Sequence, residues 1–252
     1  MTIFYFTGTG NSLAVAKRIG GDDARLISIP QVIDSTEQHY RDDAIGLVFP
    51  VYSFRAPMMV RNFLNRVKLE ANYIFAICTY GTMSGSCTNY LQKQAIGLGF
   101  KFDYTNNLKM ADNYLPLFET GKQIEKLSKK NIEQNLIRII EDIKNYKKYH
   151  VRAAIFGRIV GKLVNMDFSK SPHKYIADEK CNKCGICAKV CLSKNITIDN
   201  DIKFGESCEG CYACLHLCPQ NALHHKSEKS NKRWIHPDIT LNEIIEANNR
   251  QN

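Results

Sequence analysis

The chain has 252 residues, ten cysteines and a formal net charge of +9 at pH 7. This length allows one large domain or two domains of modest size. No apolar run approaches the roughly 20 residues that a membrane-spanning helix needs, which excludes a helical membrane protein. The first residues show neither a basic n-region nor a cleavage site, so we expect a strand there and no signal peptide.

The first predicted element is an apolar, β-branched and aromatic strand over residues 2–6. A turn rich in glycine and hydroxyl groups follows, and a helix is predicted over residues 13–19. This order presents backbone N–H groups and a helix N-terminus to a phosphate. A Rossmann turn would need glycine at Leu13, and the G-K-[ST] ending of a P-loop is absent. The turn can instead bind a phosphate monoester with neutral donors. Its residues are Thr7, Gly8, Thr9, Gly10, Asn11 and Ser12.

The rest of the first half alternates strands with helices. Strands are predicted over residues 24–28, 44–49, 73–79 and 102–109, and helices over residues 57–67 and 84–96. The alternation indicates an α/β fold with a doubly wound parallel sheet, which we expect in the order 2-1-3-4-5. In that order the ligand crevice lies at the carboxyl ends of the first, third and fourth strands.

The turn at residues 7–12 resembles the T-x-T-G-N-[TS] phosphate loop of flavodoxins, which hold FMN; an ordinary glycine-rich turn is the alternative. The resemblance implies that two further loops flank the isoalloxazine ring. They comprise Pro50, Val51 and Tyr52 after the third strand, and Thr79, Tyr80, Gly81 and Thr82 after the fourth. Tyr52 and Tyr80 are candidates to stack on the ring, with a purely structural role as the alternative. The loop at residues 110–116, with Asn113 and Tyr114, is a further candidate at the same edge.

Residues 121–149 are predicted to be helical and to close the first domain, and residues 151–164 to form an amphipathic helix. From Lys144 to Lys174 there are eight basic residues and one acid, Asp167. We expect the amphipathic helix to pack between two domains, with attachment to a membrane surface as the alternative. The basic segment would steer an acidic redox partner protein. No nucleic-acid motif accompanies the charge, which disfavours nucleic-acid binding.

Eight cysteines form two runs that each read C-x₂-C-x₂-C-x₃-C. The runs are Cys181, Cys184, Cys187 and Cys191, then Cys208, Cys211, Cys214 and Cys218. Zinc sites usually pair two C-x₂₋₄-C knuckles and often include histidine, and disulfides need an oxidising compartment. The spacing therefore favours iron–sulfur clusters in a cytoplasmic protein. Cys78 and Cys87 lie outside the runs and are expected to be buried structural cysteines.

Residues 174–226 resemble the bacterial-type two-cluster ferredoxins, in which the fourth cysteine of each run ligates the other cluster. The resemblance implies two [4Fe–4S] clusters. One takes Cys181, Cys184, Cys187 and Cys218, and the other takes Cys208, Cys211, Cys214 and Cys191. Leu192 stands where the family has proline, which is not a ligand, so ligation is unaffected. In the tail that follows, Trp234 and Pro237 are expected to hold the chain against the body, and Thr240 begins a capping box that opens a helix over residues 241–247.

The whole arrangement resembles fused flavodoxin–ferredoxin proteins found in anaerobes. The implied parts are a flavodoxin-like domain at residues 1–150, a linker helix at 151–173, a ferredoxin domain at 174–226 and a tail at 227–252. The resemblance implies electron transfer between FMN and the clusters for a redox partner in anaerobic metabolism. Two alternatives remain: a flavin-dependent reductase of a small substrate, fed by the clusters, or a docking subunit without FMN. The sequence shows no catalytic triad or carboxylate pair, which favours an electron carrier over a substrate-specific enzyme.

Overall fold

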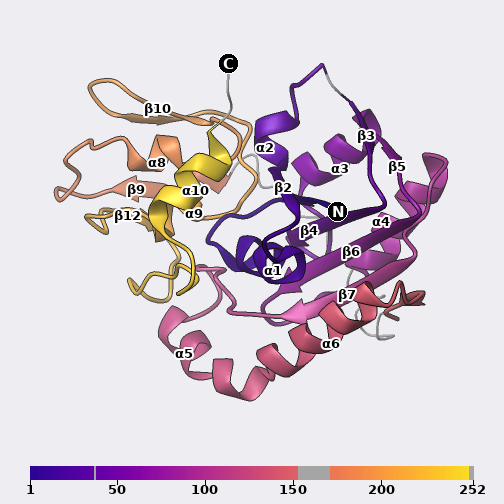
Figure 1. Cartoon of the computed structure of the whole chain (residues 1–252). Helices are drawn as coiled ribbons and strands as arrows, with labels where there is room; N and C mark the ends of the chain where they lie inside the picture. The colour runs from indigo at the N-terminus through magenta and orange to yellow at the C-terminus, as the bar shows by residue number, and fades with distance from the viewer. Residues whose placement is uncertain (37, 153–170, 250–252) are drawn as a thin grey trace.

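The computed structural model describes residues 1–36, 38–152 and 171–249. Its centre is a six-stranded parallel sheet in the order β2-β1-β4-β6-β7-β8 (Figure 1). The strands are β1 (Thr2–Tyr5), β2 (Arg25–Ser28), β4 (Ala44–Pro50), β6 (Tyr73–Tyr80), β7 (Tyr104–Lys109) and β8 (Tyr149–His150). The first five confirm the predicted order 2-1-3-4-5, and β8 adds an edge strand that the sequence did not predict.

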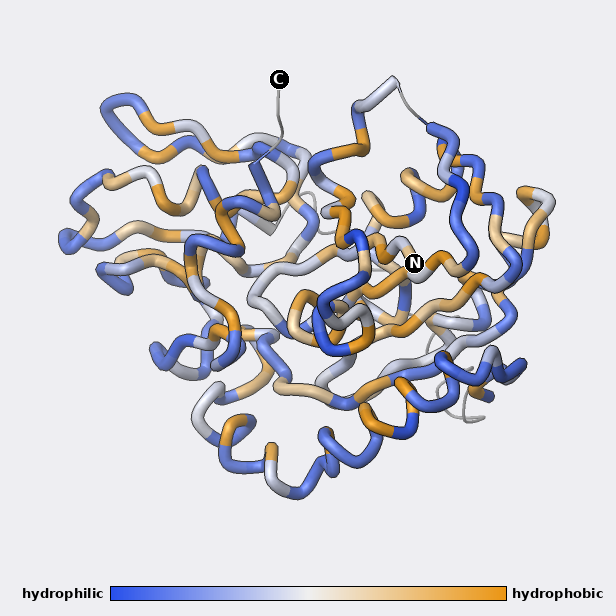
Figure 2. The backbone as a smooth tube through the Cα atoms, viewed as in Figure 1, coloured by the Kyte–Doolittle hydropathy of each residue, from blue (hydrophilic) through white to orange (hydrophobic). Residues whose placement is uncertain are grey.

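Helices cover both faces of the sheet, because successive strand residues point to opposite sides. Ile3 and Phe75 pack on the side of α1 (Asn11–Gly20) and α6 (Ile132–Lys144). Phe4 and Phe49 pack on the other side, against α3 (Met58–Arg66) and α4 (Cys87–Gly97). Figure 2 shows the apolar stretches gathered along the central strands.

Several short elements complete this half of the chain. They are α2 (Ile29–Val32), β3 (His39–Arg41), β5 (Lys68–Glu70), α5 (Thr120–Glu125) and η1 (Leu127–Lys130). The prediction of helix throughout residues 121–149 was wrong in detail. Asn131 has φ 49° and separates η1 from α6, and the segment ends in β8. A left-handed residue between two helical runs forces the chain to change direction there.

The cysteine-rich part is a duplicated unit. Its elements are η2 (Ser171–Lys174), β9 (Tyr175–Ala177), α8 (Ile186–Lys189), β10 (Ile196–Ile198), β11 (Ile202–Phe204), α9 (Ala213–His216) and β12 (Leu223–His225). Each cysteine of the first run lies 27 positions before its counterpart, as Cys181 does before Cys208. The same offset relates β9 to β11, α8 to α9 and β10 to β12. The strands pair antiparallel as β10 with β11 and β9 with β12.

The tail returns to the part of the chain that forms the six-stranded sheet, the sheet half (β1 to β8), and ends in α10 (Leu241–Asn248). The predicted capping box is present, since Thr240 and Glu243 exchange hydrogen bonds between side chain and backbone. The Ser28 hydroxyl donates to the Ala247 carbonyl, and Lys17 pairs with Glu243. Ile244 of α10 shares an apolar cluster with Leu13 of α1, and Asn248 Nδ2 donates to the Val190 carbonyl of the cysteine-rich part at 3.0 Å, so the tail contacts both halves.

Most of the predicted linker helix at residues 151–164 lies outside the described residues, as do Arg158, Lys162 and Lys170. The boundaries of the four predicted parts remain a prediction. Among the described residues, none of the helices has both the length and the apolar character to cross a membrane.

Candidate cofactor sites

A pocket of about 250 Å³ opens at the carboxyl ends of β1, β4 and β6. The structure brings to it every residue predicted to contact FMN except Gly10. They are Thr7, Gly8, Thr9, Asn11, Ser12, Pro50, Val51, Tyr52, Thr79, Tyr80, Gly81 and Thr82. This is the position at which an open α/β sheet binds ligands, because the crossovers leave β1 and β4 toward opposite faces.

Gly10 shapes the pocket without lining it. Its φ of 97° is left-handed, and a Cβ there would lie 3.0 Å from His236 and 3.1 Å from Ile239. Glycine is needed because a side chain would meet the tail and strain the backbone. Gly10 is also the N-cap of α1, and it supplies no side-chain cap. The first N–H groups of a helix have no acceptor within the helix, so this uncapped end favours an anion.

The hydroxyls of the turn keep their protons available. Thr7 Oγ1 accepts the Gly10 N–H at 3.1 Å, and Thr9 Oγ1 accepts from Asn113 Nδ2 at 2.7 Å. Both contacts use the hydroxyl as an acceptor, which leaves its O–H free to donate. Ser12 and Thr79 share one hydrogen bond of 2.9 Å, so one of the two O–H groups is also free. This set of donors suits an acceptor-only phosphate.

Asn11 differs from its neighbours because both ends of its amide are engaged. Nδ2 donates to the Ala111 carbonyl at 3.2 Å, and Oδ1 accepts the indole N–H of Trp234 at 3.1 Å. The side chain therefore positions the turn. Trp234 confirms the prediction that the tail is held against the body, although its partner in the phosphate loop could not be predicted.

Two tyrosines predicted to flank the ring are both at the pocket. The pKa of Tyr52 lies well above its ordinary value, and that of Tyr80 is raised, in both cases mainly because burial disfavours the phenolate. Tyr52 opens a two-residue turn in which Ser53 and Phe54 have φ of 47° and 65°. Tyr52 and Arg55 exchange two backbone hydrogen bonds of 2.9 and 3.0 Å across it. Left-handed residues other than glycine are strained, and such strain concentrates at ligand sites.

The sequence did not single out several other residues that line the pocket. They are Ser53, Phe54, Met83, Ala111, Asp112, Leu117, Phe118, Gly210 and Tyr212; Asn113 and Tyr114 of the further candidate loop line it too. Asp112 accepts the Thr82 hydroxyl at 2.8 Å and the Tyr114 N–H at 3.1 Å. Burial raises the pKa of its carboxyl despite these bonds. The only sequence signal for the loop at residues 110–116 was its position, because it follows the fifth predicted strand at the same edge of the sheet.

The eight cysteines divide into two quartets, each around its own small cavity. Quartet A is Cys181, Cys184, Cys187 and Cys218, and quartet B is Cys191, Cys208, Cys211 and Cys214. Each cavity is thus lined by three cysteines of one run and the last cysteine of the other run. The cause is the duplicated geometry, in which each run places its last cysteine beyond α8 or α9 and toward the other half of the unit. The predicted ligand sets of the two clusters stay a prediction.

Backbone N–H groups point at the sulfurs of both quartets. Asn195 N donates to Cys191 Sγ at 3.2 Å and Ala222 N to Cys218 Sγ at 3.3 Å, two positions related by the repeat. Gly210 N donates to Cys208 Sγ at 3.4 Å. Such N–H···S bonds suit thiolate acceptors and help to set cluster potentials.

Without a cation, the inner thiols resist ionisation. Burial raises the pKa of Cys187 to about 11, with the neighbouring Cys218 thiol adding to the shift. Burial also raises the pKa of Cys214 well above its ordinary value, followed by the effect of Cys211. These positions would carry thiolates once a positively charged centre bound them. Cys78 and Cys87 are buried apart from both quartets, as expected.

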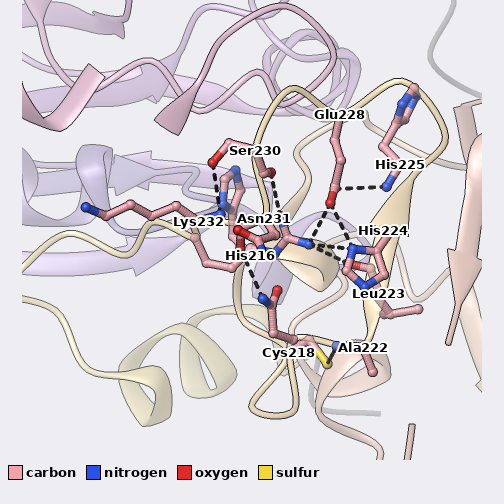
Figure 3. Close-up of polar contacts among 12 residues, drawn as sticks. His216, Cys218, Ala222, Leu223, His224, His225, Glu228, Ser230, Asn231 and Lys232 are labelled. Atoms are coloured by element: carbon pink, nitrogen blue, oxygen red, sulfur yellow. Dashed lines mark hydrogen bonds and ion pairs between the residues drawn. The ribbon is translucent and has the colours of Figure 1, made fainter. Parts of the chain in front are cut away.

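The tail and quartet A meet in a network of polar contacts (Figure 3). Arg233 donates to the Leu223 carbonyl at 3.0 Å and to Glu228 at 3.2 Å, which anchors the loop after β12. His216 Nδ1 accepts the Trp234 N–H at 3.1 Å, so Nε2 carries the proton and donates to the Asn113 carbonyl at 2.8 Å. Burial lowers the pKa of His216 to about 4, which keeps the ring neutral. Through Asn113 this network reaches Thr9 in the phosphate loop.

Glu209 makes a second link between the halves, which sequence reasoning missed. It lies beside Cys208, and its two carboxylate oxygens accept the N–H groups of Met58 and Met59 at 3.0 and 2.8 Å. These groups belong to the start of α3. A carboxylate at this place satisfies two open donors and complements the helix dipole.

The fold is flavodoxin-like. Its strand order and the pocket at the switch point between β1 and β4 establish this. No family model matches the chain, and no curated protein matches it.

Solved structures resemble about half of the chain at low identity. The two-electron reduced flavodoxin of Megasphaera elsdenii is 20% identical, over 51% of this chain and 99% of its own, with a TM-score of 0.36. A flavoprotein in complex with FMN from Lactobacillus acidophilus is 13% identical, over 50% and 97%, with a TM-score of 0.32. An NAD(P)H:quinone oxidoreductase from Methanothermobacter marburgensis is 12% identical, over 60% and 97%, with a TM-score of 0.36.

Proposed function

We propose that this chain is an electron-transfer flavoprotein that holds FMN in the pocket and one [4Fe–4S] cluster in each cysteine quartet. Clusters pass single electrons and a flavin accepts one or two, so together they connect one-electron and two-electron partners. The observation that carries the proposal is a shared wall: Gly210 and Tyr212, which flank Cys211 of quartet B, line the same pocket as the phosphate loop.

Three features of the pocket support FMN. The N-terminus of α1 is uncapped, the hydroxyls of Thr7 and Thr9 keep free protons, and aromatic side chains line the rest of the space. No lysine or arginine is among the described lining residues. A phosphate would therefore be bound by neutral donors and the helix end.

The spacing of the cysteines and their grouping around two cavities support clusters over single metal ions. A zinc site holds four sulfurs about 2.3 Å from one ion, which brings them into close contact. Within the described ranges, no group of three or more His, Cys, Asp or Glu side chains is placed to hold one metal ion. In a cubane cluster each cysteine binds a different iron, so one cluster needs four cysteines around one shared space, and four cysteines line each of the two cavities.

The same proposal covers the layout and setting of the protein. We assign residues 1–150 to the flavin half and 174–226 to a ferredoxin half that works with a redox partner protein in a reducing, oxygen-poor cytoplasm. We propose that this partner is acidic, since the segment from Lys144 to Lys174 is basic. Two of its lysines, Lys147 and Lys148, pair with Asp142 and Asp103 within the chain. These pairs reduce the charge that the basic segment offers to a partner.

A reductive titration tests the function. Anaerobically purified protein, titrated with dithionite and followed by visible absorbance, should take up about four electrons per chain, one for each cluster and two for the flavin. Uptake of about two electrons, unchanged after added FMN, would contradict the flavin part and favour a docking subunit.

Matched cysteine variants sharpen the test. Cys208→Ser should lower the iron content and the electron uptake, because it removes a ligand of quartet B. Cys78→Ser is the control, since Cys78 lies in β6 and its thiol donates to Asn107 at 2.8 Å. Equal iron loss in both variants would contradict the assigned ligands.

A further inference from the structure

The two quartets have different surroundings. Quartet B borders the pocket through Gly210 and Tyr212. Among the described residues that line the pocket, none belongs to quartet A or is adjacent in sequence to one of its cysteines. The pocket is therefore next to one quartet and separated from the other.

The contact between quartet B and the phosphate loop is direct. A Cβ placed on Gly8 would lie 3.2 Å from both Cβ and the carbonyl oxygen of Cys211, and 3.2 Å from the Tyr52 hydroxyl. Tyr52 and Cys211 also share one apolar cluster. Gly8 and Tyr52, which line the pocket, therefore pack close to a cysteine of quartet B.

Quartet B is also fixed against the sheet half. Glu209, the residue after Cys208, bonds to the first turn of α3, and Leu192, the residue after Cys191, is buried in the cluster that contains Phe49. Glu209 belongs to the second run of cysteines and Leu192 follows the first run. Two separate contacts with the sheet half therefore fix the position of quartet B relative to the pocket.

Quartet A faces solvent. Cys184 is exposed, and so are Asn182, Lys183 and Pro219, which line the cavity of this quartet. Figure 1 shows α8 and β10 at the end of the molecule away from β6 and β7. An external protein can approach this cavity without displacing any part of the sheet half.

We infer that the quartets act in series, with quartet A as the exchange site for an external one-electron carrier protein and quartet B as the site that exchanges electrons with the pocket. This inference rests on the proposed function. With a cluster bound in each quartet, one electron given up by the carrier in each passage would reach the cysteines of quartet A first and those of quartet B next. Two passages, with protons taken from water, supply the two electrons that a flavin accepts.

Phosphorus NMR of the dithionite-reduced holoprotein tests the order. Reduced clusters are paramagnetic, so the closer one accelerates relaxation of the FMN phosphate, whose loop touches Cys211. Cys181→Ser, in quartet A, should keep most of the acceleration, and Cys208→Ser, in quartet B, should lose most of it. The opposite pattern would overturn the series and leave the proposed function intact. Absence of any bound phosphate signal would overturn both.

A measurement on the unaltered protein covers variants that fail to fold. A dysprosium chelate added to the reduced holoprotein should enhance the electron spin relaxation of one cluster signal several-fold more than that of the other. The strongly affected signal should be the one that Cys181→Ser removes. Equal enhancement of both signals would contradict a solvent-facing quartet A and an enclosed quartet B.

Discussion

At the scale of single residues, the phosphate loop depends on side chains far away in sequence. Asn11 is held by Trp234, and Thr9 by Asn113, which in turn bonds to His216. The hydroxyl and glycine pattern of residues 7–12 predicts a phosphate site because it is local. The partners that orient it come from the tail and the cysteine-rich unit, and no local pattern could indicate them.

Trp234→Phe should weaken FMN binding and leave the iron content unchanged. It removes the indole N–H that bonds to Asn11 and keeps most of the buried aromatic surface. Losing one such bond costs about 1 kcal/mol, or about a five-fold rise in Kd. Fluorescence titration with FMN measures the change. Tyr146→Phe is the control, because it removes a hydroxyl contact with Asp43 outside the pocket. An unchanged Kd in the Trp234 variant would contradict the role given to the tail.

Asp112→Asn should stabilise the protein at pH 7 and above. The pKa of Asp112 is raised by burial, so the folded state holds this proton more tightly than the unfolded state, whose pKa is 3.8. Stability is therefore lost as pH rises from about 3.8 through the raised pKa, and it stays lower above that range.

Thermal unfolding of the two proteins between pH 3.5 and pH 8 measures this difference, because the titration begins near the unfolded-state pKa of 3.8. The advantage of Asp112→Asn should shrink toward the acidic end of the range. Glu125→Gln, at an exposed carboxylate, is the control and should show no such trend. A variant that is less stable than the parent at pH 8 would show that the ionised carboxylate is favourable.

At the scale of elements, the regular strands were predictable because they are apolar and buried. All residues of β1 and nearly all of β4 and β6 are buried, and the predicted strands overlap them closely. The short, partly exposed β3 and β5 carry no such signal. The break at Asn131 was also missed, because the isoleucines and leucines of residues 121–149 continue a helical pattern on both sides of it.

Glu209→Ala should destabilise the junction between α3 and quartet B. It leaves the N–H groups of Met58 and Met59 without their carboxylate, and loss of a helix cap costs about 1 to 2 kcal/mol. Glu209→Gln should cost less, because its amide oxygen still accepts one N–H. Anaerobic thermal unfolding of the holoprotein gives the comparison, with Glu206→Ala as the control at an exposed neighbour. Equal unfolding temperatures for the two alanine variants would contradict the cap.

At the scale of the whole molecule, the two halves share one packed structure. A single apolar cluster includes Phe75 of the sheet, Ile139 of α6, Tyr212 beside quartet B and Ile244 of α10. The sequence predicted each half from its own motif. Their mutual placement depends on contacts such as Glu209 with α3, whose partners are about 150 positions apart in the chain.

We propose that one chain holds both a flavin and two clusters. Iron, acid-labile sulfide and flavin content of anaerobically purified protein, with a visible spectrum before and after dithionite, measures this directly. We expect about eight irons, about eight sulfides and one FMN per chain, with both chromophores bleached on reduction. Zinc in place of iron, or eight irons with no flavin even after added FMN, would contradict it.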